Sequence, residues 1–285
     1  MKITEILKSK KSVLSFEVFP PKTITNYESV FCAVKGIASL NPDFISVTYG
    51  AGGGTSDYTV SIAQEIKKLG VNPLAHLSCI SHGKADVQEK LNQLKSLGIE
   101  NILALRGDLP KDFAGNLDYS YASELVGEVK RFGGFCIGGA CYPEGHPESK
   151  SIQEDIENLK KKVDAGCEFL TTQMFFDNDI YYDFLSQIQS SGISVPIIAG
   201  IMPVTNAAQI KRIISMSGTD LPVRFKRIVE RFGDNPDAMK QAGIAYATEQ
   251  VIDLYANGIK AAHIYSMNKP DVASAIKANL SEILC

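Results

Sequence analysis

The 285-residue sequence has no tryptophan, only four histidines and a net charge of only −3. So small a charge gives no electrostatic footprint for nucleic acid or for an anionic membrane. No apolar run reaches the length of a membrane span. The amphipathic N-terminus, MKITEILKSKKSVLSF, lacks the apolar core and the cleavage site of a signal peptide. These absences predict a cytoplasmic protein without a nucleic acid or membrane partner.

The sequence also lacks the cysteine and histidine spacings of metal sites. None of the six cysteines belongs to a CxxC pair, and most lie in apolar runs, as reduced core thiols of a cytoplasmic protein do. They are Cys32, Cys79, Cys136, Cys141, Cys167 and Cys285. The four histidines show no ligand spacing, so no metal is expected.

One stretch, SVLSFEVFPP at 12–21, places a carboxylate inside an apolar run. Its hydrophobic residues predict a strand buried on both faces, which Pro20 and Pro21 end because proline cannot donate to a ladder. Glu17 lies within that strand, where a carboxylate is costly unless it is paired or keeps its proton. Two interpretations stay open for Glu17: a strand-end residue paired with a cation, or a general acid.

Short apolar strands alternate with helical stretches along the whole chain. After the first strand, the others are expected at 43–49, 72–80, 101–105, 135–142, 169–173, 195–201 and 261–265. An extra helix at 222–232 interrupts the rhythm, and the final helix is expected at 270–284. Eight strands in this order predict an α/β fold, a (β/α)8 TIM barrel with an extra N-terminal helix and an inserted helix before the last βα unit.

A doubly wound sheet is the structural alternative to the barrel. The count of eight strands disfavours it, and so does the glycine-rich loop at 50–54, because GAGGGT is not the G-x-G-x-x-G phosphate fingerprint. The loop is interpreted as a flexible connection that lets a ligand approach the backbone, and a plain turn is the alternative.

In a barrel, the chemistry lies at the C-terminal ends of the strands. Polar residues follow these ends: Glu17, Thr48, Tyr49, His76, Arg106, Asp108, Tyr142, His146, Gln173 and Lys269. Taken singly, each of these residues has a structural explanation. His76 could be a core histidine, Arg106 could pair with Asp108, and Gln173 could cap a neighbouring loop. Together they predict one mouth with two acids, two cations and several hydrogen-bonding groups.

The expected helix at 151–166 carries two stripes. Ile152, Ile156, Leu159 and Val163 have the spacing of a core stripe, and Asp155, Asn158 and Lys162, with Lys161 beside them, form a polar stripe. From spacing alone, a solvated face is the favoured interpretation of the polar stripe. A seat for a ribose–pyrophosphate would use the same carboxylate, amide and ammonium groups.

At this point the motifs resemble those of the methylenetetrahydrofolate reductases. The resemblance lies in FEVFPP, SVTYGAGG, HLSC, ALRGDLP, YPEGHPE, NLKKKVDAG, TQMFFD, GIMPV and the YSMNK run, in family order from residue 12 to 269. The chain looks like the single-domain bacterial type, without the C-terminal regulatory domain of eukaryotic members. It would then be one FAD-binding catalytic barrel over 1–285.

The resemblance implies an oxidoreductase of one-carbon metabolism with non-covalent FAD. NADH or NADPH passes hydride to the flavin and leaves, and 5,10-methylenetetrahydrofolate then takes the hydride and becomes 5-methyltetrahydrofolate. Glu17 falls on the general acid that assists opening of the imidazolidine ring, and Asp108 on the carboxylate near pterin and flavin.

The remaining matches concern binding. Gln173 falls on a residue that contacts folate and nicotinamide in turn, and Gln209 on a folate contact. FAD-contacting positions fall on Thr48, Tyr49, Ala51, His76, Arg106, Gly107, Asp108, Ala122, Tyr142, His146, Asp155, Asn158, Lys161 and Lys162. Lys269 stands where the family commonly has an arginine that approaches folate, and lysine lacks the bidentate fork. Val18 stands where an aromatic residue is usual.

Two other functions stay open. The same folate chemistry could take its electrons from a protein partner, or the chain could be a non-catalytic FAD-binding subunit of a larger complex. The acid pair Glu17 and Asp108 argues against the second. The choice between NADH and NADPH is open, because no contact to the ribose 2′ position is identifiable, and a homo-oligomer is expected.

Overall fold

The computed structural model of the chain describes residues 1–21, 26–49, 56–80, 82–107, 118–217 and 219–284. Within these ranges, eight parallel strands form a closed barrel in chain order, and β1 pairs with both β2 and β8. The strands are β1 (Val13–Val18), β2 (Phe44–Val47), β3 (Asn72–Ser78), β4 (Asn101–Leu105), β5 (Cys136–Cys141), β6 (Phe169–Thr172), β7 (Ile197–Ile201) and β8 (Ala261–Ile264). The predicted (β/α)8 barrel is confirmed.

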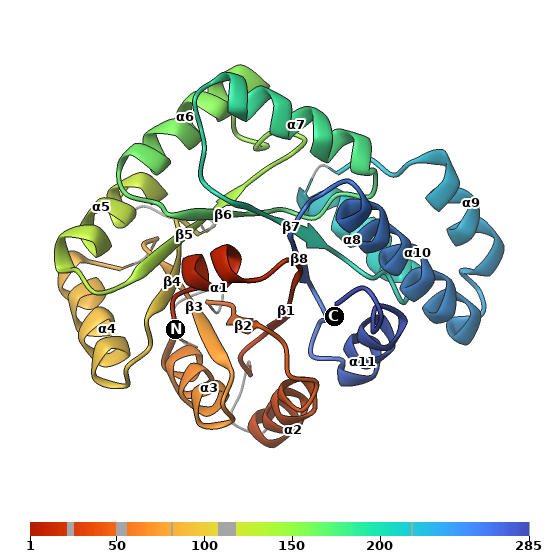
Figure 1. Cartoon of the computed structure of the whole chain (residues 1–285), viewed down its shortest axis with the longest axis horizontal. Helices are drawn as coiled ribbons and strands as arrows, with labels where there is room; N and C mark the ends of the chain where they lie inside the picture. Colours follow the sequence, from red (N-terminus) through yellow and green to blue (C-terminus); the bar gives the residue numbers. More distant parts are fainter. Residues whose placement is uncertain (22–25, 50–55, 81, 108–117, 218, 285) are drawn as a thin grey trace.

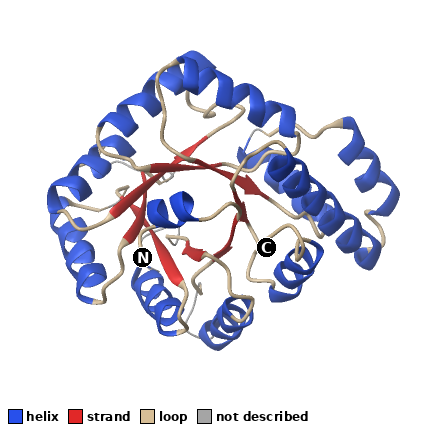
Figure 2. Ribbon diagram, in the orientation of Figure 1, coloured by secondary structure: helices blue, strands red, loops and turns tan. Residues whose placement is uncertain are grey.

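Except for the first, the helices surround the ring of strands (Figures 1 and 2). They are α1 (Ile3–Ser9), α2 (Tyr27–Ala38), α3 (Ser56–Lys68), α4 (Lys84–Ser96), α5 (Ala122–Phe132), α6 (Ile152–Asp164), α7 (Asn178–Ser190), α8 (Ala207–Ser217), α9 (Val223–Phe232), α10 (Pro236–Ala256) and α11 (Pro270–Asn279). The strands are buried along nearly their whole length, as expected when helices cover one face and the barrel interior the other. The continuous apolar runs of the sequence follow from this double burial.

The N-terminal helix α1 closes one end of the barrel. Figure 1 shows it at the centre of the ring of strands. Its buried Ile3, Ile6 and Leu7 pack against Phe44 and Phe169, which project from the barrel strands. The backbone N–H of Ile3 also donates to Asn101 Oδ1 at 2.8 Å. With the N-terminal ends of the strands plugged, the C-terminal ends form the open mouth, where barrel enzymes carry their chemistry.

The inserted helix α9 is confirmed, between α8 and α10. Its Phe225 stacks on Phe176 at 5.1 Å between ring centroids and lies 4.6 Å from the Tyr246 ring of α10. The α10 helix starts at an N-cap, Asn235, whose side chain accepts from Ala238 N, followed by proline in the first turn. The last helix, expected to reach residue 284, instead ends at Asn279, and its C-cap residue Leu280 is buried.

Two burial predictions need correction. Ile152, expected in the core stripe of α6, is 44% exposed, whereas Ile156 and Leu159 are buried. Ile152 directly follows the N-cap Ser151, so it lies in the first turn, and there it lines a small surface hollow with His146 rather than the core. Cys32 is exposed on α2, although the other four cysteines of the described ranges are buried.

The described helices include none that is both long and apolar enough to cross a bilayer. In the same ranges, no cluster of three or more histidine, cysteine, aspartate or glutamate side chains has the arrangement of a metal site.

Candidate active site at the barrel mouth

Glu17 lies inside the barrel near the C-terminal end of β1. Its side chain is nearly buried, with the residue 7% exposed, and Oε2 accepts a hydrogen bond from Ser46 Oγ at 3.3 Å. The same oxygen lies 3.6 Å from His76 Nε2 and 3.9 Å from His263 Nε2. The described neighbours of this carboxylate are thus a hydroxyl and two imidazoles. Pairing with a lysine or arginine, one form of the first interpretation left open for Glu17, is not seen among the described residues.

His76 presents an open nitrogen to this cluster. Burial is the main cause that lowers its pKa to about 4, partly opposed by the neighbouring Glu17 carboxylate. Its ring is therefore neutral near pH 7. The buried Nε2 has no hydrogen-bond partner among the described residues. A buried polar atom without a partner is costly, so this nitrogen is suited to a ligand or to a carboxyl group that moves closer.

His263 completes the cluster, and the sequence analysis missed it. Its Nδ1 lies 2.7 Å from Ser15 Oγ and its Nε2 lies 2.9 Å from Ser46 Oγ. The available signal was its place in the apolar strand AAHIY, the same kind of signal that singled out Glu17. Close by, burial first and the Glu17 charge second raise the pKa of Tyr265 well above its usual value.

The end of β8 clamps the end of β1. Ser266 Oγ donates to the carbonyl of Glu17 at 3.0 Å. The Asn268 side chain accepts from Phe19 N at 2.8 Å and donates to Phe19 O at 3.0 Å. Met267 and Asn268 both have positive φ, 54° and 55°, so the chain turns sharply here. These bonds fix the backbone that carries Glu17.

Arg106 at the end of β4 meets the β5–α6 loop. Both terminal nitrogens of its guanidinium donate to the Glu148 carboxylate at 2.6 Å, a bidentate pair. This partner was not foreseen; Asp108, the partner considered from sequence, lies outside the described residues. Gly107 follows at φ +88°, and a Cβ there would lie 2.2 Å from Ser78 Oγ, so only glycine fits.

The polar stripe of α6 divides into two parts. Lys162 Nζ turns inward and donates to the Ala140 carbonyl of β5 at 2.6 Å, and burial lowers its pKa. Asp155 accepts from Ser149 Oγ at 3.3 Å, and burial raises its pKa. Asn158 and Lys161 are exposed and hydrogen-bond each other at 3.0 Å. The solvated-face interpretation thus describes this second pair, while Asp155 and Lys162 lie toward the barrel.

Two pairs of a tyrosine and a histidine ring lie among the expected FAD contacts and their neighbours. The Tyr142 ring meets His146 edge-on at 4.6 Å between centroids. Tyr49 OH lies 3.1 Å from His82 Nε2, with the rings edge-on at 5.5 Å. The carbonyl of Thr48 accepts from Thr59 Oγ1 at 3.0 Å. The other expected FAD contacts comprise Ala122, the first residue of α5, and Ala51, which lies outside the described residues.

The expected folate contacts lie on the β6, β7 and β8 side. Gln173 Oε1 accepts from Met174 N at 3.0 Å, the loop-cap role that sequence left open. Gln209 lies in the first turn of α8 and is partly exposed. Lys269, the N-cap residue of α11, extends its ammonium to Thr205 Oγ1 at 2.7 Å.

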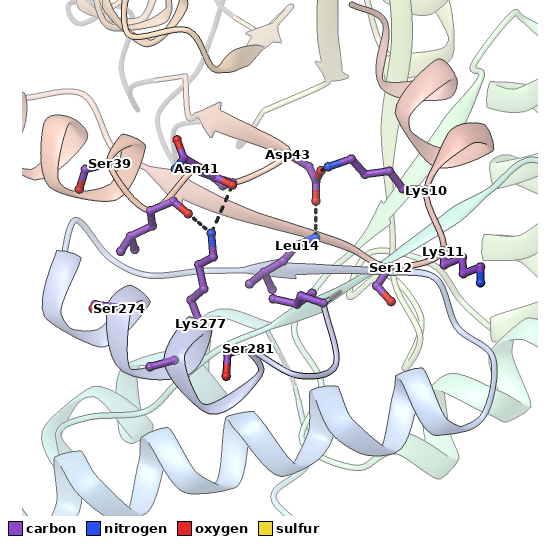
Figure 3. A pocket seen from close by; sticks show the side chains of 14 residues that line it. Lys10, Lys11, Ser12, Leu14, Ser39, Asn41, Asp43, Ser274, Lys277 and Ser281 are labelled. Carbon is purple, nitrogen blue, oxygen red and sulfur yellow. Dashed lines mark hydrogen bonds and ion pairs between the residues drawn. The ribbon is translucent and has the colours of Figure 1, made fainter.

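A groove of about 750 Å³ lies at the opposite, N-terminal end of the strands, between α2 and α11 (Figure 3). Lys277 there donates to the carbonyls of Leu40 and Asn41, and Lys10 pairs with Asp43. These two cations are already satisfied by the chain itself, so the groove is secondary to the mouth as a candidate site.

The family model for methylenetetrahydrofolate reductase matches residues 2–281. The chain belongs to this family. It is 38% identical over 264 residues to the 5,10-methylenetetrahydrofolate reductases of Pectobacterium carotovorum and of Escherichia coli K12, covering 92% of this chain and 88% of each relative. It is 35% identical to methylenetetrahydrofolate reductase (NADH) 1 of Arabidopsis thaliana, covering 99% of this chain but only 50% of the plant protein.

Among solved structures, a protein of Clostridium thermocellum superposes with a TM-score of 0.72, over 99% of this chain and all of that chain. It is described as binding two copies of 5-methyl-5,6,7,8-tetrahydrofolic acid. At 14% identity, this likeness shows the shared barrel fold. The methylenetetrahydrofolate reductase motifs FEVFPP, HLSC and YPEGHPE thus lie at the mouth of such a barrel, at the ends of β1, β3 and β5.

Proposed function

We propose that the chain reduces 5,10-methylenetetrahydrofolate to 5-methyltetrahydrofolate through bound FAD, with NADH or NADPH as the electron donor. The observation that carries the proposal is the buried Glu17 carboxyl, held between Ser46, His76 and His263 at the mouth of a barrel of the reductase family. Residues 1–285 would act as a single catalytic domain. A cytoplasmic location and a homo-oligomeric state remain predictions.

The residues at the mouth fit a flavin dinucleotide. His76 Nε2 is buried without a partner among the described residues, and Gly107 leaves a space that a Cβ would fill. Lys162 and Asp155 are charged groups in partly buried positions near β5. We assign these residues to FAD, together with Thr48, Tyr49, Arg106, Tyr142 and His146, while Ala51, Asp108, Ala122, Asn158 and Lys161 rest on the family resemblance. FAD, when bound, supplies hydride transfer between the nicotinamide and the folate.

Glu17 is assigned the proton transfer. Opening of the imidazolidine ring leaves a nitrogen that needs a proton, and a carboxyl group within hydrogen-bond reach is suited to supply it. Ser46 Oγ and the Glu17 backbone bond to Ser266 orient the carboxyl group. Asp108 would stabilise the positive charge that develops on the folate, as the resemblance implies.

Folate would bind between the β6, β7 and β8 ends. Gln173 offers an amide, Gln209 a second amide from α8, and Lys269 an ammonium for a carboxylate of the folate tail. The clostridial protein of the same barrel fold, described as binding 5-methyl-5,6,7,8-tetrahydrofolic acid, supports folate as a ligand for such a fold. An ammonium makes a point contact, so the tail would be held less rigidly here than by a guanidinium.

Anaerobic rapid mixing tests the proposal. The purified protein, reconstituted with FAD, would be mixed separately with NADH, NADPH and methyltetrahydrofolate while flavin absorbance is followed. Bleaching by a nicotinamide and by methyltetrahydrofolate supports the proposed cycle. Bleaching by methyltetrahydrofolate alone points to a protein electron donor, and a flavin inert to all three contradicts reductase activity.

A further inference from the structure

Glu148, in the loop between β5 and α6, contacts two of the residues assigned to FAD. Its carboxylate accepts from both terminal nitrogens of Arg106 at 2.6 Å, and its backbone N–H donates to His146 Nδ1 at 3.1 Å. Arg106 lies at the end of β4, and His146 lies in the loop after β5. One residue to which no role has been assigned therefore joins two parts of the proposed cofactor site.

The loop that carries Glu148 is also anchored by the next residue, Ser149. Ser149 N donates to the carbonyl of His146 at 2.9 Å, and Ser149 Oγ donates to Asp155 Oδ1 at 3.3 Å. Asp155 is itself assigned to FAD, and it lies in the first turn of α6. These bonds hold the backbone of Glu148 between His146 and the start of α6, while its side chain extends to the end of β4.

The backbone of Arg106 is anchored from the other side. Its carbonyl accepts from Ser78 Oγ and from Ile80 N, each at 2.8 Å, which joins the ends of β3 and β4. Its Nε donates to the carbonyl of Gly107 at 3.2 Å. Glu148 adds two parallel bonds at the far end of the side chain. A bidentate pair of this kind sets the direction of a guanidinium as well as its distance.

A carboxylate in this place has two opposite effects on an anionic ligand. It repels the ligand, and it orients the arginine that attracts the ligand. The side chain of Glu148 is 59% exposed, so water and salt screen the repulsion, whereas the side chain of Arg106 is only 19% exposed. Screening does not undo the orientation of Arg106, so the net effect of Glu148 on dinucleotide binding should be favourable.

We propose that Glu148 is a positioning residue for FAD: it holds the Arg106 guanidinium and, through its backbone, the His146 ring in the arrangement that receives the cofactor. With Nδ1 accepting from the backbone, a neutral His146 carries its proton on Nε2 and can donate from there. Donors prepared in this way suit the phosphate and hydroxyl oxygens of a dinucleotide. The inference rests on the proposed function only in taking FAD as the ligand, and it requires no folate reaction.

Titration of FAD into the flavin-free full chain, followed by flavin fluorescence, measures this role without any reaction. Glu148→Gln is the informative change, because the amide keeps the size of the side chain but turns an N–H group toward one of the two Arg106 donors. The dissociation constant of FAD should rise by about five- to tenfold, as for one side chain that must now be ordered on binding. An unchanged or a lower dissociation constant would overturn the proposal, because Glu148 would then have no effect or only a repulsive one.

Glu157→Gln is the matched control. Glu157 is an exposed glutamate of α6, and its carboxylate accepts from Gln153 Nε2 at 3.3 Å. The change removes the same charge, so the dissociation constant of FAD should stay as it is or fall slightly. A rise as large as that in Glu148→Gln would overturn the proposal, since the loss of charge alone would then explain both. Melting temperatures check that both variants are folded.

A double-mutant cycle shows whether Glu148 acts through Arg106. In an Arg106→Lys background, Glu148→Gln should have little further effect on the dissociation constant of FAD, because lysine cannot form the paired bonds. A full further rise in this background would overturn the proposal, since Glu148 would then act on FAD without Arg106.

The same titrations separate this inference from the proposed function. A wild type that binds FAD, but whose flavin reacts with neither a nicotinamide nor methyltetrahydrofolate, contradicts the reductase activity, and the titrations still decide the role of Glu148. A reactive wild type with an unchanged dissociation constant in Glu148→Gln overturns the inference alone. A wild type that binds no FAD overturns both.

Discussion

Lys269 Nζ donates a hydrogen bond of 2.7 Å to Thr205 Oγ1, and this bond joins the loops that follow β7 and β8. Lys269 is also the N-cap residue of α11, directly after the two positive-φ residues Met267 and Asn268. The turn at Met267 and Asn268 and the hydroxyl of Thr205 thus place the Lys269 ammonium at the barrel mouth.

The first prediction concerns this ammonium. Lys269→Ala should raise the folate Michaelis constant by about 10- to 100-fold, as for a lost charge-assisted contact worth roughly 1.5–3 kcal/mol. Flavin reduction by NADH should be nearly unchanged. Thr205→Val is the matched variant, because it keeps the charge and removes only the bond that holds it, and its effect should be smaller. An unchanged folate Michaelis constant in Lys269→Ala would show that the ammonium does not contact folate.

A second prediction separates two neighbouring lysines of α6. Lys162 is partly buried and bonded to β5, whereas Lys161 is exposed, so Lys162→Met should lower FAD retention on purification far more than Lys161→Met. The wild type should purify yellow, and acid precipitation should release FAD. Thermal melting of both variants controls for unfolding. Equal retention in the two variants would show that Lys162 does not help to hold FAD, and a wild type that stays colourless in excess FAD would contradict the assignment of this cofactor.

The third prediction concerns a close approach in α10. A Cβ on Gly243 would lie 1.8 Å from the carbonyl oxygen of Val204, which belongs to the loop after β7. Gly243→Ala should therefore lower stability by about 1–3 kcal/mol through overpacking. Gly127 of α5 is the matched control, because a Cβ there would meet only Arg131 Nη1, at 3.7 Å. Gly127→Ala should stabilise by roughly 0.5–1 kcal/mol. The urea midpoints of unfolding measure the change in stability of both variants. If Gly243→Ala left stability unchanged, the loop that carries Val204 would have moved to make room for the methyl group.

The fourth prediction is a pH dependence of stability. The pKa of His76 falls from 6.5 in the unfolded chain to about 4 in the folded one, so between these values the unfolded state binds more protons. Stability should therefore be full above pH 6.5 and decline as the pH falls toward 4, with a contribution on the order of 3 kcal/mol. His76→Gln removes the titrating group and, with it, this pH-dependent contribution to stability. The difference in unfolding free energy between variant and wild type, measured at several pH values, should change over this window. A constant difference would contradict the burial effect.

The strands were predictable because their signal is local. Short apolar runs marked all eight, and the barrel followed from their alternation with helices. Glu17 was found by the same reasoning, as a carboxylate inside such a run. His263 satisfied the same criterion and was missed, since its importance depends on the register that sets it beside Ser15 and Ser46.

Contacts between loops were not predictable. Glu148 proved to be the partner of Arg106, 42 residues away, because the β5–α6 loop folds over the end of β4. The spacing of α6 placed Ile152 in the core, but Ile152 is the first residue of the helix after the N-cap Ser151, and it is exposed. Periodicity shows which residues share a face of a helix, and it does not show where along the barrel that helix starts.

The last prediction tests Glu17 itself. Glu17→Gln keeps the size of the side chain and its contact with Ser46 but removes the acidic proton. Hydride transfer from a nicotinamide to the flavin needs no proton donor, so FAD binding and that half-reaction should stay close to wild type. The folate half-reaction should slow by at least about 10²–10⁴-fold, as for lost general acid catalysis.

A structural role for Glu17 predicts a different outcome. If its charge only held the end of β1, Glu17→Gln would lower the melting temperature and FAD retention, and both half-reactions would suffer together. Rapid-reaction traces of both halves on one preparation distinguish these cases. Ser15→Ala is a suitable control. It removes a hydroxyl from the same strand, but this hydroxyl bonds His263 and does not bond the Glu17 carboxylate. If the folate half-reaction were unimpaired in Glu17→Gln, or both halves slowed equally, Glu17 would not be the general acid, and the proton would have to come from another group at the mouth.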